Sequence, residues 1–240
     1  MRPVILVIQN AEWEGPGLID LYARAAGVGL VKVELFRKSA NHALKIPFGE
    51  LEKGAFSAVV GLGSPSTSYL PESNPHHREL VRLFKLTRRR RIPSFNKCYS
   101  MQLFSLVHGG SVVSNPAGKE VGFREVRPTP EGRHDKVIGS IGPYTTLQWH
   151  GDIVEELPKG AVCLAYSKRT KNQVAVLDGI HYMVQADGQA AIPSMVRSWL
   201  RHDGSWATEG TGIRKAELVS QAVETEADLR NTFLRIFGNF

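Results

Sequence analysis

The chain has 240 residues, of which 42% are hydrophobic and 22% charged, and these proportions exclude a disordered protein. A domain of this length buries roughly 70% or more of its unfolded surface, so it needs no disulfide or structural metal. Lys and Arg outnumber Asp and Glu by 30 to 23, and the net charge of +7 favours anionic partners without identifying one. We therefore expect one α/β domain over residues 1–240.

The basic residues are spread along the chain, and their only compact block is Arg88–Arg91. No aromatic residue interrupts this block, whereas surfaces that bind nucleic acid commonly interleave aromatic and basic side chains. The block is therefore interpreted as the solvated end of a helix, and nucleic acid is not an expected partner.

Cysteine usage and hydropathy indicate the compartment. The two cysteines, Cys98 and Cys163, are far apart and have no Cys or His at metal-ligand spacing, so we expect no disulfide, metal or cofactor and a reducing compartment. The apolar run Val4–Ile8 is too short for the core of a signal peptide, and no segment approaches the ~20 apolar residues of a membrane span. A cytoplasmic location, without membrane attachment, is the expectation.

In the first half of the chain, short apolar runs alternate with segments of helical period, which predicts a mostly parallel central sheet flanked by helices. Glycine-rich turns separate several of these elements. The predicted strands are Val4–Gln9, Val31–Phe36, Phe56–Val60 and Ile92–Lys97, and the predicted helices are Leu18–Ala26, Arg78–Leu86 and Tyr99–Val107.

The second half is predicted to consist mostly of strands and turns, followed by helices at the C-terminus. A connector over His202–Gly212 is expected between the last two helical regions, which places a C-terminal helical extension at about 203–240. The predicted strands are Gly122–Val126, Thr146–Trp149, Val162–Tyr166, Gln173–Leu177 and His181–Val184; a helix is predicted at Ile192–Leu200, and one or two amphipathic helices at Ile213–Phe237.

Cys98 lies at the junction between a predicted strand and the helix that follows it. The N–H groups of a helix N-terminus lower the pKa of a thiol, so Cys98 is a candidate nucleophile, with Lys97 as a contributing cation. The alternative is a buried structural thiol, since free cysteine is among the most buried residue types. Cys163, within a short apolar run, is expected in the core.

Several segments in the same order resemble the motifs of class I glutamine amidotransferases. The segment from Ile92 to Leu103, with Gly109-Gly110 after it, is similar to the nucleophile segment of that family. The further matches are Leu62-Gly63-Ser64-Pro65, Glu120-Val121-Gly122, Trp149-His150-Gly151-Asp152, Leu157-Pro158-Lys159-Gly160-Ala161, Ala165-Tyr166-Ser167 and Asn172-Gln173.

The resemblance implies a Rossmann-like, flavodoxin-like α/β fold in which Cys98 attacks the side-chain amide of glutamine. It also implies an oxyanion loop at Gly63 and Ser64, and a substrate pocket formed by Tyr99, Gln102, Trp149, Gly151 and Asp152. The substrate would be glutamine or a related amide or amino acid. Most members of the family deliver ammonia to a synthetase, so a synthetase or ligase subunit is an expected partner.

The chain departs from the family at the other two members of the catalytic triad. Where the family has Gln-Phe-His-Pro-Glu, this sequence has Gln185-Ala186-Asp187-Gly188-Gln189. Aligned without a gap, the general-base histidine becomes Asp187 and the orienting glutamate becomes Gln189. A carboxylate beside a thiolate repels it and raises the thiol pKa. Ordinary glutamine hydrolysis is therefore expected to be lost or strongly impaired.

Two further departures concern glycines. Ser100 replaces the glycine two residues after the cysteine, and Ser64 replaces a glycine of the oxyanion loop, so we expect a relaxed or tilted elbow.

His150 is the nearest remaining imidazole, interpreted either as a substitute base or as part of the pocket wall. The segment around Glu14 and Gly15-Pro16-Gly17 lacks the glycine-lysine signature of a phosphate loop. The other histidines are expected at the surface or in turns: His42, His76, His77, His108, His134, His181 and His202.

Three hypotheses remain open. The first is an enzyme in which Cys98 attacks an amide or acyl carbon with help from Asp187, His150 or the substrate. The second is a pseudo-enzyme that binds a metabolite or a synthetase partner through the old pocket. The third is an interaction protein whose basic face, including Arg88–Arg91, docks an anionic partner.

Overall fold

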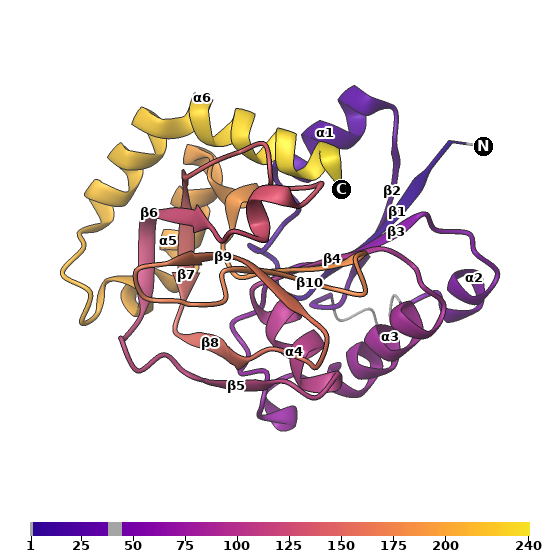
Figure 1. Ribbon diagram of the computed structural model, residues 1–240. Coiled ribbons are helices and arrows are strands. Elements are labelled where there is room, and N and C mark those ends of the chain that lie inside the picture. Colours follow the sequence, from indigo (N-terminus) through magenta and orange to yellow (C-terminus); the bar gives the residue numbers. More distant parts are fainter. Residues whose placement is uncertain (1, 38–44) are drawn as a thin grey trace.

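The computed structural model describes residues 2–37 and 45–240 (Figure 1). In these residues, nine strands form one mixed sheet in the order β2-β1-β3-β4-β11-β10-β9-β6-β7. Its strands are β1 (Val4–Gln9), β2 (Gly29–Glu34), β3 (Ala58–Gly61), β4 (Ser94–Lys97), β6 (Glu120–Pro128), β7 (Tyr144–His150), β9 (Val162–Ser167), β10 (Val174–Leu177) and β11 (His181–Val184).

The five strands from β2 to β11 run parallel, and the remaining four extend the sheet in antiparallel pairs. The predicted α/β fold is therefore confirmed. The helices are α1 (Leu18–Ala26), α2 (Phe48–Glu52), α3 (His77–Arg89), α4 (Tyr99–Val107), α5 (Pro193–Thr208) and α6 (Lys215–Asn239), with short 3₁₀ turns at Pro71–Ser73, Gly132–His134 and Gly188–Ala190.

Alternate side chains of the parallel strands pack on the two sheet faces, as the two-residue period of a strand requires. In β1, Leu6 and Ile8 pack in one cluster with residues of α3 and α4, whereas Ile5 and Val7 pack in another with residues of α1 and α6. Figure 1 shows α3 and α4 on one side of the sheet and α1 and α6 on the other. Both faces are covered, which is why β1 and β3 are almost continuously apolar.

A third apolar cluster joins α5 and α6 to the antiparallel part of the sheet. Trp199 of α5 and Leu218 of α6 are buried in it together with Trp149 of β7. The C-terminal helices therefore contribute to the core, and the boundary expected at residue 203 lies inside α5.

Several predicted boundaries need correction. The connector expected at His202–Gly212 is wrong because α5 continues to Thr208, with Gly204 inside it and only 209–214 between the helices. At Gly204, a Cβ would lie 2.9 Å from Cε of Lys215, so the glycine provides space for a helix contact rather than ending the helix. The last helical region is the single helix α6, and β2 begins two residues earlier than predicted.

The sequence patterns missed a two-stranded antiparallel sheet made of β5 (Ser111–Ser114) and β8 (Asp152–Glu156). Strand β5 follows α4 in the chain, and β8 begins at Asp152, the last residue of the segment from Trp149 to Asp152. The small sheet therefore connects the nucleophile segment with that second motif. Helix α2 was also missed.

The structure also bears on the expectations made for the basic block, for single histidines and for Cys163. Helix α3 ends at Arg89, and the Arg88 guanidinium lies 2.8 Å from the Asp178 carboxylate, so the basic block does occupy a helix end. His181 is fully buried rather than at the surface, and Cys163 is half-buried rather than in the core. His42 lies outside the described residues. Within the described ranges, no helix has both the length and the apolar character that crossing a membrane requires.

Candidate active site

The centre of the site is the turn between β4 and α4, where Cys98 has φ 46° and ψ −114°. A positive φ is uncommon for a residue with a side chain. Here two backbone hydrogen bonds of Cys98, one through its N–H and one through its carbonyl, stabilise it. The Cys98 N–H donates to the carbonyl of Val184 on β11 (2.8 Å), and its carbonyl accepts from the Gln102 N–H (3.0 Å). The sharp elbow is therefore retained, and the expected relaxation does not occur.

Ser100 fits at this elbow because a glycine lies opposite it on β3. A Cβ at Gly61 would come within 2.7 Å of Cβ and Oγ of Ser100, so the absence of a side chain at Gly61 provides the space. The Ser100 hydroxyl donates to the Leu62 carbonyl at 2.7 Å and ties the start of α4 to the end of β3.

The loop after β3 contains the predicted oxyanion residues. Asn10 Nδ2 donates to the carbonyls of Leu62 (2.9 Å) and Gly63 (3.2 Å), and the Ser64 hydroxyl accepts from the Ser66 N–H (3.2 Å). The carboxyl of Glu14 packs directly against Gly63, where a Cβ would lie 2.3 Å from Glu14 Oε2. Gly63 therefore provides the space for a buried acid that the sequence patterns did not connect with this site.

Asp187 and Gln189 lie in the turn after β11, the strand next to β4, and both are fully buried. Gln189 Nε2 donates to Asp187 Oδ1 at 3.4 Å, and Asp187 N–H donates to the Leu147 carbonyl at 2.8 Å. The pair is oriented by the protein, but it carries no imidazole.

Lys97, the last residue of β4, is also fully buried, and its ammonium donates to the Ala186 carbonyl. Burial lowers the pKa of Lys97 to about 8, while the negative charges of Asp187, Cys98 and Glu14 act in the opposite direction. Burial likewise raises the pKa of Asp187, an effect that Lys97 opposes. An ammonium and a carboxyl group thus share a nearly dry region beside the thiol.

The electrostatics around Cys98 disfavour its thiolate form. Burial raises its pKa well above the ordinary value, Asp187 and Glu14 add to the rise, and the Tyr99 N–H and Lys97 oppose it only in part. The expectation of a lowered pKa at the helix N-terminus is therefore wrong, because desolvation and two carboxyl groups outweigh the helix.

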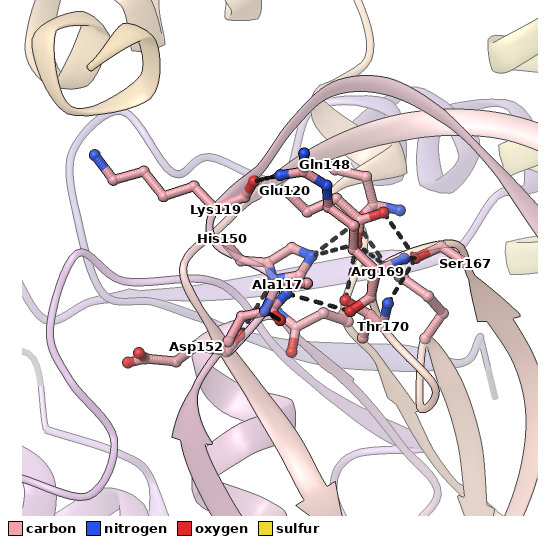
Figure 2. Close-up of polar contacts among 12 residues, drawn as sticks. Ala117, Lys119, Glu120, Gln148, His150, Asp152, Ser167, Arg169 and Thr170 are labelled. Atoms are coloured by element: carbon pink, nitrogen blue, oxygen red, sulfur yellow. Dashed lines mark hydrogen bonds and ion pairs between the residues drawn. The ribbon is translucent and has the colours of Figure 1, made fainter. Parts of the chain in front are cut away.

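His150 is bound into the polar network that Figure 2 shows. Its Nδ1 lies 3.1 Å from the Asp152 carbonyl, and its Nε2 lies 3.1 Å from Gln148 Oε1 and 3.3 Å from Glu120 Oε2. Ser167 and Thr170 donate to the same Glu120 carboxylate at 2.7 and 2.8 Å.

The Glu120 carboxylate is the centre of this network. Burial raises its pKa, but hydrogen bonds and charge from His150, with the hydroxyls of Ser167 and Thr170, outweigh burial and hold that pKa below its ordinary value. Both ring nitrogens of His150 are therefore engaged with protein oxygens. In the described part of the chain, no side-chain hydrogen bond joins His150 to Cys98.

A cavity of about 200 Å³ opens beside Cys98. Seven of the predicted site residues line it, namely Ser64, Cys98, Gln102, Trp149, His150, Gly151 and Asp152. Gly63 and Tyr99 do not line the cavity: Gly63 packs against the Glu14 carboxyl, and the Tyr99 ring packs in the core while its backbone N–H donates to the Cys98 thiol. Asp187 and Gln189 are fully buried and are not among the residues that line the cavity.

Sequence patterns missed Glu14, Asp203 and Trp206 of the cavity wall. Lys97 was expected as a cation beside the thiol, but not that its side chain is fully buried. The only available signal was Glu14 beside a glycine-rich turn, which was considered for phosphate binding. Asp203 and Trp206 fell in the supposed connector, so their helical positions were not considered.

A cysteine on a sharp strand-to-helix elbow, at the carboxyl edge of a parallel sheet, is the geometry of the class of α/β proteins with an elbow nucleophile. The family model for "Glutamine amidotransferase class-I" matches residues 22–181, and the chain belongs to this family.

Solved structures support the same fold. A glutamine amidotransferase from Thermotoga maritima aligns with a TM-score of 0.84 at 21% identity, covering 99% of this chain and 97% of that one. A glutamine amidotransferase from Methylobacillus flagellatus aligns with a TM-score of 0.83 at 20% identity, covering 100% and 94%. A putative GMP synthase subunit from Thermoplasma acidophilum aligns with a TM-score of 0.63 at 20% identity, covering 79% and 85%. No curated protein matches the sequence.

Proposed function

We propose that this protein is a class I glutamine amidotransferase-like protein in which ordinary glutamine hydrolysis is lost or strongly impaired. The observation that carries the proposal is the group beside the thiol: the buried pair Asp187 and Gln189, hydrogen-bonded at 3.4 Å, occupies the turn after β11. In a cysteine amidohydrolase, an imidazole in this position takes the thiol proton and returns it to the departing ammonia.

Neither replacement performs that transfer in the usual way. A carboxylate at Asp187 disfavours the thiolate, and Gln189 has no ionisable group with which to orient a base. His150, the remaining imidazole at the cavity, has both nitrogens engaged by Asp152, Gln148 and Glu120. Loss of a positioned acid-base group commonly costs about 10²- to 10⁴-fold in rate, and triad members act as a unit.

The second candidate is an enzyme in which Cys98 attacks another amide or acyl compound. The observation that favours it is the elbow itself, since Cys98 keeps a strained backbone and lies open to a cavity although the rest of the triad is replaced. Asp187, or a basic group of the substrate, would then accept the thiol proton.

The experiment is ammonia and glutamate release from L-glutamine by the purified protein, compared with Cys98→Ala and with the double variant Asp187→His and Gln189→Glu. We expect no turnover in the first two and a gain in the double variant, because the elbow and pocket are already formed. Cysteine-dependent turnover by the unmodified protein would contradict the proposal.

A synthetase or ligase subunit is the partner class that we propose, with a cytoplasmic location. The support is the structural similarity to the Thermoplasma acidophilum chain, which is described as a putative subunit of GMP synthase. If this protein binds such a partner without hydrolysing glutamine, its pocket would serve as a metabolite-binding or partner-binding site.

A further inference from the structure

A second cavity, of about 640 Å³, is lined by β6, by the end of β9 with the turn after it, and by the connector between α5 and α6. In the part of the chain that the structure describes, it shares no lining residue with the cavity beside Cys98. Its wall contains two carboxylates and five cationic side chains, so we call it the basic cavity. The cations are Lys119, Arg124, Arg127, Lys168 and Arg169.

Both carboxylates of the basic cavity are already neutralised by protein groups. The hydroxyls of Ser167 and Thr170 donate to the Glu120 carboxylate at 2.7 and 2.8 Å, in the network that also includes His150. The Glu125 carboxylate lies 2.6 Å from the Arg127 guanidinium. Neither carboxylate therefore balances the remaining cations.

Three of the cations are left without a counterion. Within the described ranges, Arg124, Lys168 and Arg169 form no ion pair. The Arg124 guanidinium donates to the Phe123 carbonyl at 3.3 Å, and that of Arg169 donates to the Lys119 carbonyl at 2.8 Å (Figure 2). A guanidinium has five N–H donors, so both arginines keep donors for a ligand.

The turn after β9 fixes two of these cations against the sheet. The Ser167 N–H donates to the Thr170 carbonyl at 2.8 Å, and the Ser167 hydroxyl accepts from the Thr170 N–H at 3.1 Å. The hydroxyls of both residues bind Glu120 of β6, so the backbone that carries Lys168 and Arg169 is anchored at both ends. Binding to groups whose backbone is already ordered costs less entropy.

The basic cavity also has an aromatic and apolar part. Tyr166, which is 43% exposed, lines it and is the cross-strand partner of Arg127. Val121 and Ile213 line the same cavity. An exposed aromatic ring with apolar neighbours can pack against a flat ring of a ligand.

We propose that the basic cavity binds a small molecule that carries two or more phosphate charges together with a flat aromatic group, which is the chemistry of a nucleotide. The arginine guanidinium matches a phosphate in shape and charge, and several cations at one site favour a multiply charged anion. The volume of about 640 Å³ lies within the roughly 300–1,000 Å³ of small-molecule sites.

The basic cavity is a separate site from the one described for Cys98. Glu120 lines the basic cavity, and His150, 3.3 Å from it, lines the cavity beside Cys98. The network in Figure 2 therefore connects the walls of the two cavities. Binding of a nucleotide requires no chemistry at the thiol, so this inference does not depend on the proposed function.

The test is isothermal titration calorimetry of the purified protein with ADP as the probe. Adenosine, which lacks the phosphates, and pyrophosphate, which lacks the aromatic group, are the matched comparisons, and citrate is a multiply charged anion without phosphate. We expect ADP to bind at least about tenfold more tightly than each of the three. An excess of L-glutamine should not displace ADP, because the two cavities have no lining residue in common.

The variants Arg124→Gln and Arg169→Gln should each weaken ADP binding at least about tenfold, since each removes charged hydrogen bonds to phosphate. Arg230→Gln is the control, because it removes the same charge from an exposed position on α6 that does not line the cavity. Should Arg124→Gln fail to fold, Arg169→Gln decides the result.

Four results would overturn the proposal: no binding of ADP, binding of adenosine, pyrophosphate or citrate as tight as that of ADP, unchanged ADP affinity in both arginine variants, or displacement of ADP by glutamine. Binding of a DNA duplex without any binding of ADP would also overturn it, because the cations would then form a nucleic-acid surface. Calorimetry does not measure glutamine turnover, so failure of the proposed function would be seen separately.

Discussion

At the scale of single residues, the site is defined by the groups packed around one thiol. The elbow geometry of Cys98 is that of a nucleophile, whereas burial and the nearby carboxyls of Asp187 and Glu14 raise the pKa of its thiol. The backbone geometry therefore favours a nucleophile, whereas the raised thiol pKa disfavours one. A measurement of the reactivity of the thiol distinguishes between the two.

The reactivity of Cys98 provides a prediction at this scale. In a Cys163→Ser background, which leaves one thiol, alkylation of Cys98 by iodoacetamide should be slow at pH 7 and accelerate as pH rises, because only the thiolate reacts. Asp187→Asn should increase the rate several-fold at pH 8, since removal of that negative charge lowers the thiol pKa. Mass spectrometry of timed samples measures the rate.

Asp228→Asn is the control for this change, because Asp228 is exposed on α6. An unchanged rate in Asp187→Asn would mean that the Asp187 carboxyl already holds its proton at pH 8. That result would contradict the electrostatic account given for the thiol.

Residue identities at the site were predictable only where a motif includes them. Cys98, Gln102 and the segment from Trp149 to Asp152 were found because the family pattern spans them. Lys97 was noted because it precedes Cys98 in the chain, whereas Glu14 and Asp203 come close to the thiol only through folding, from two segments that have no shared spacing in the sequence.

At the scale of elements, apolar runs predicted the parallel strands well because both sheet faces are covered by helices. The limits of β1, α1, α4 and β11 agree with the prediction at both ends. The strands β5 and β8 were missed because they are short and partly exposed, so their alternation is weak. In α5, the last helical turns were misinterpreted as part of the connector His202–Gly212.

The last turns of α6 give a second prediction. Phe237 is buried, with its ring centroid 5.3 Å from that of Tyr22 and 5.5 Å from that of Phe95. Phe237→Ala should lower the free energy of unfolding by about 3–5 kcal/mol, from lost burial and the resulting cavity. Denaturant titration followed by circular dichroism measures it.

Val223→Ala in the same helix is the matched control, because Val223 is 55% exposed and its truncation should change stability by less than about 0.5 kcal/mol. Equal effects of the two substitutions would contradict the packing of α6 against the sheet.

At the scale of the whole molecule, the three apolar clusters show how the C-terminal helices belong to the fold. Residues of α6 contribute to two of them, one with β4 and α1 and one with β6, β7 and α5. In Figure 1, α6 crosses the molecule from the edge near β6 to α1. Sequence periodicity predicted that this segment is helical, but it could not indicate which face of the sheet it covers.

The deletion of residues 215–240 tests this assignment. We expect the shortened chain to lose cooperative unfolding and to bind a hydrophobic dye. Removal of Phe233, Ile236 and Phe237 would expose the apolar face of the sheet against which they pack. Thermal denaturation and dye fluorescence measure both effects. A shortened chain that unfolds cooperatively would show instead that α6 is a separable extension.

The contact between Gly61 and Ser100 has a consequence for how this site is inherited. The two residues lie on different elements, β3 and α4, but occupy one shared space, so the requirement for a small residue belongs to the pair and not to either position. We expect the positions to covary among relatives, a glycine at one permitting a side chain at the other. Whether a nucleophile elbow can form then depends on the combined volume of the two side chains, and a serine two residues after the cysteine is not in itself a sign that the elbow has been lost.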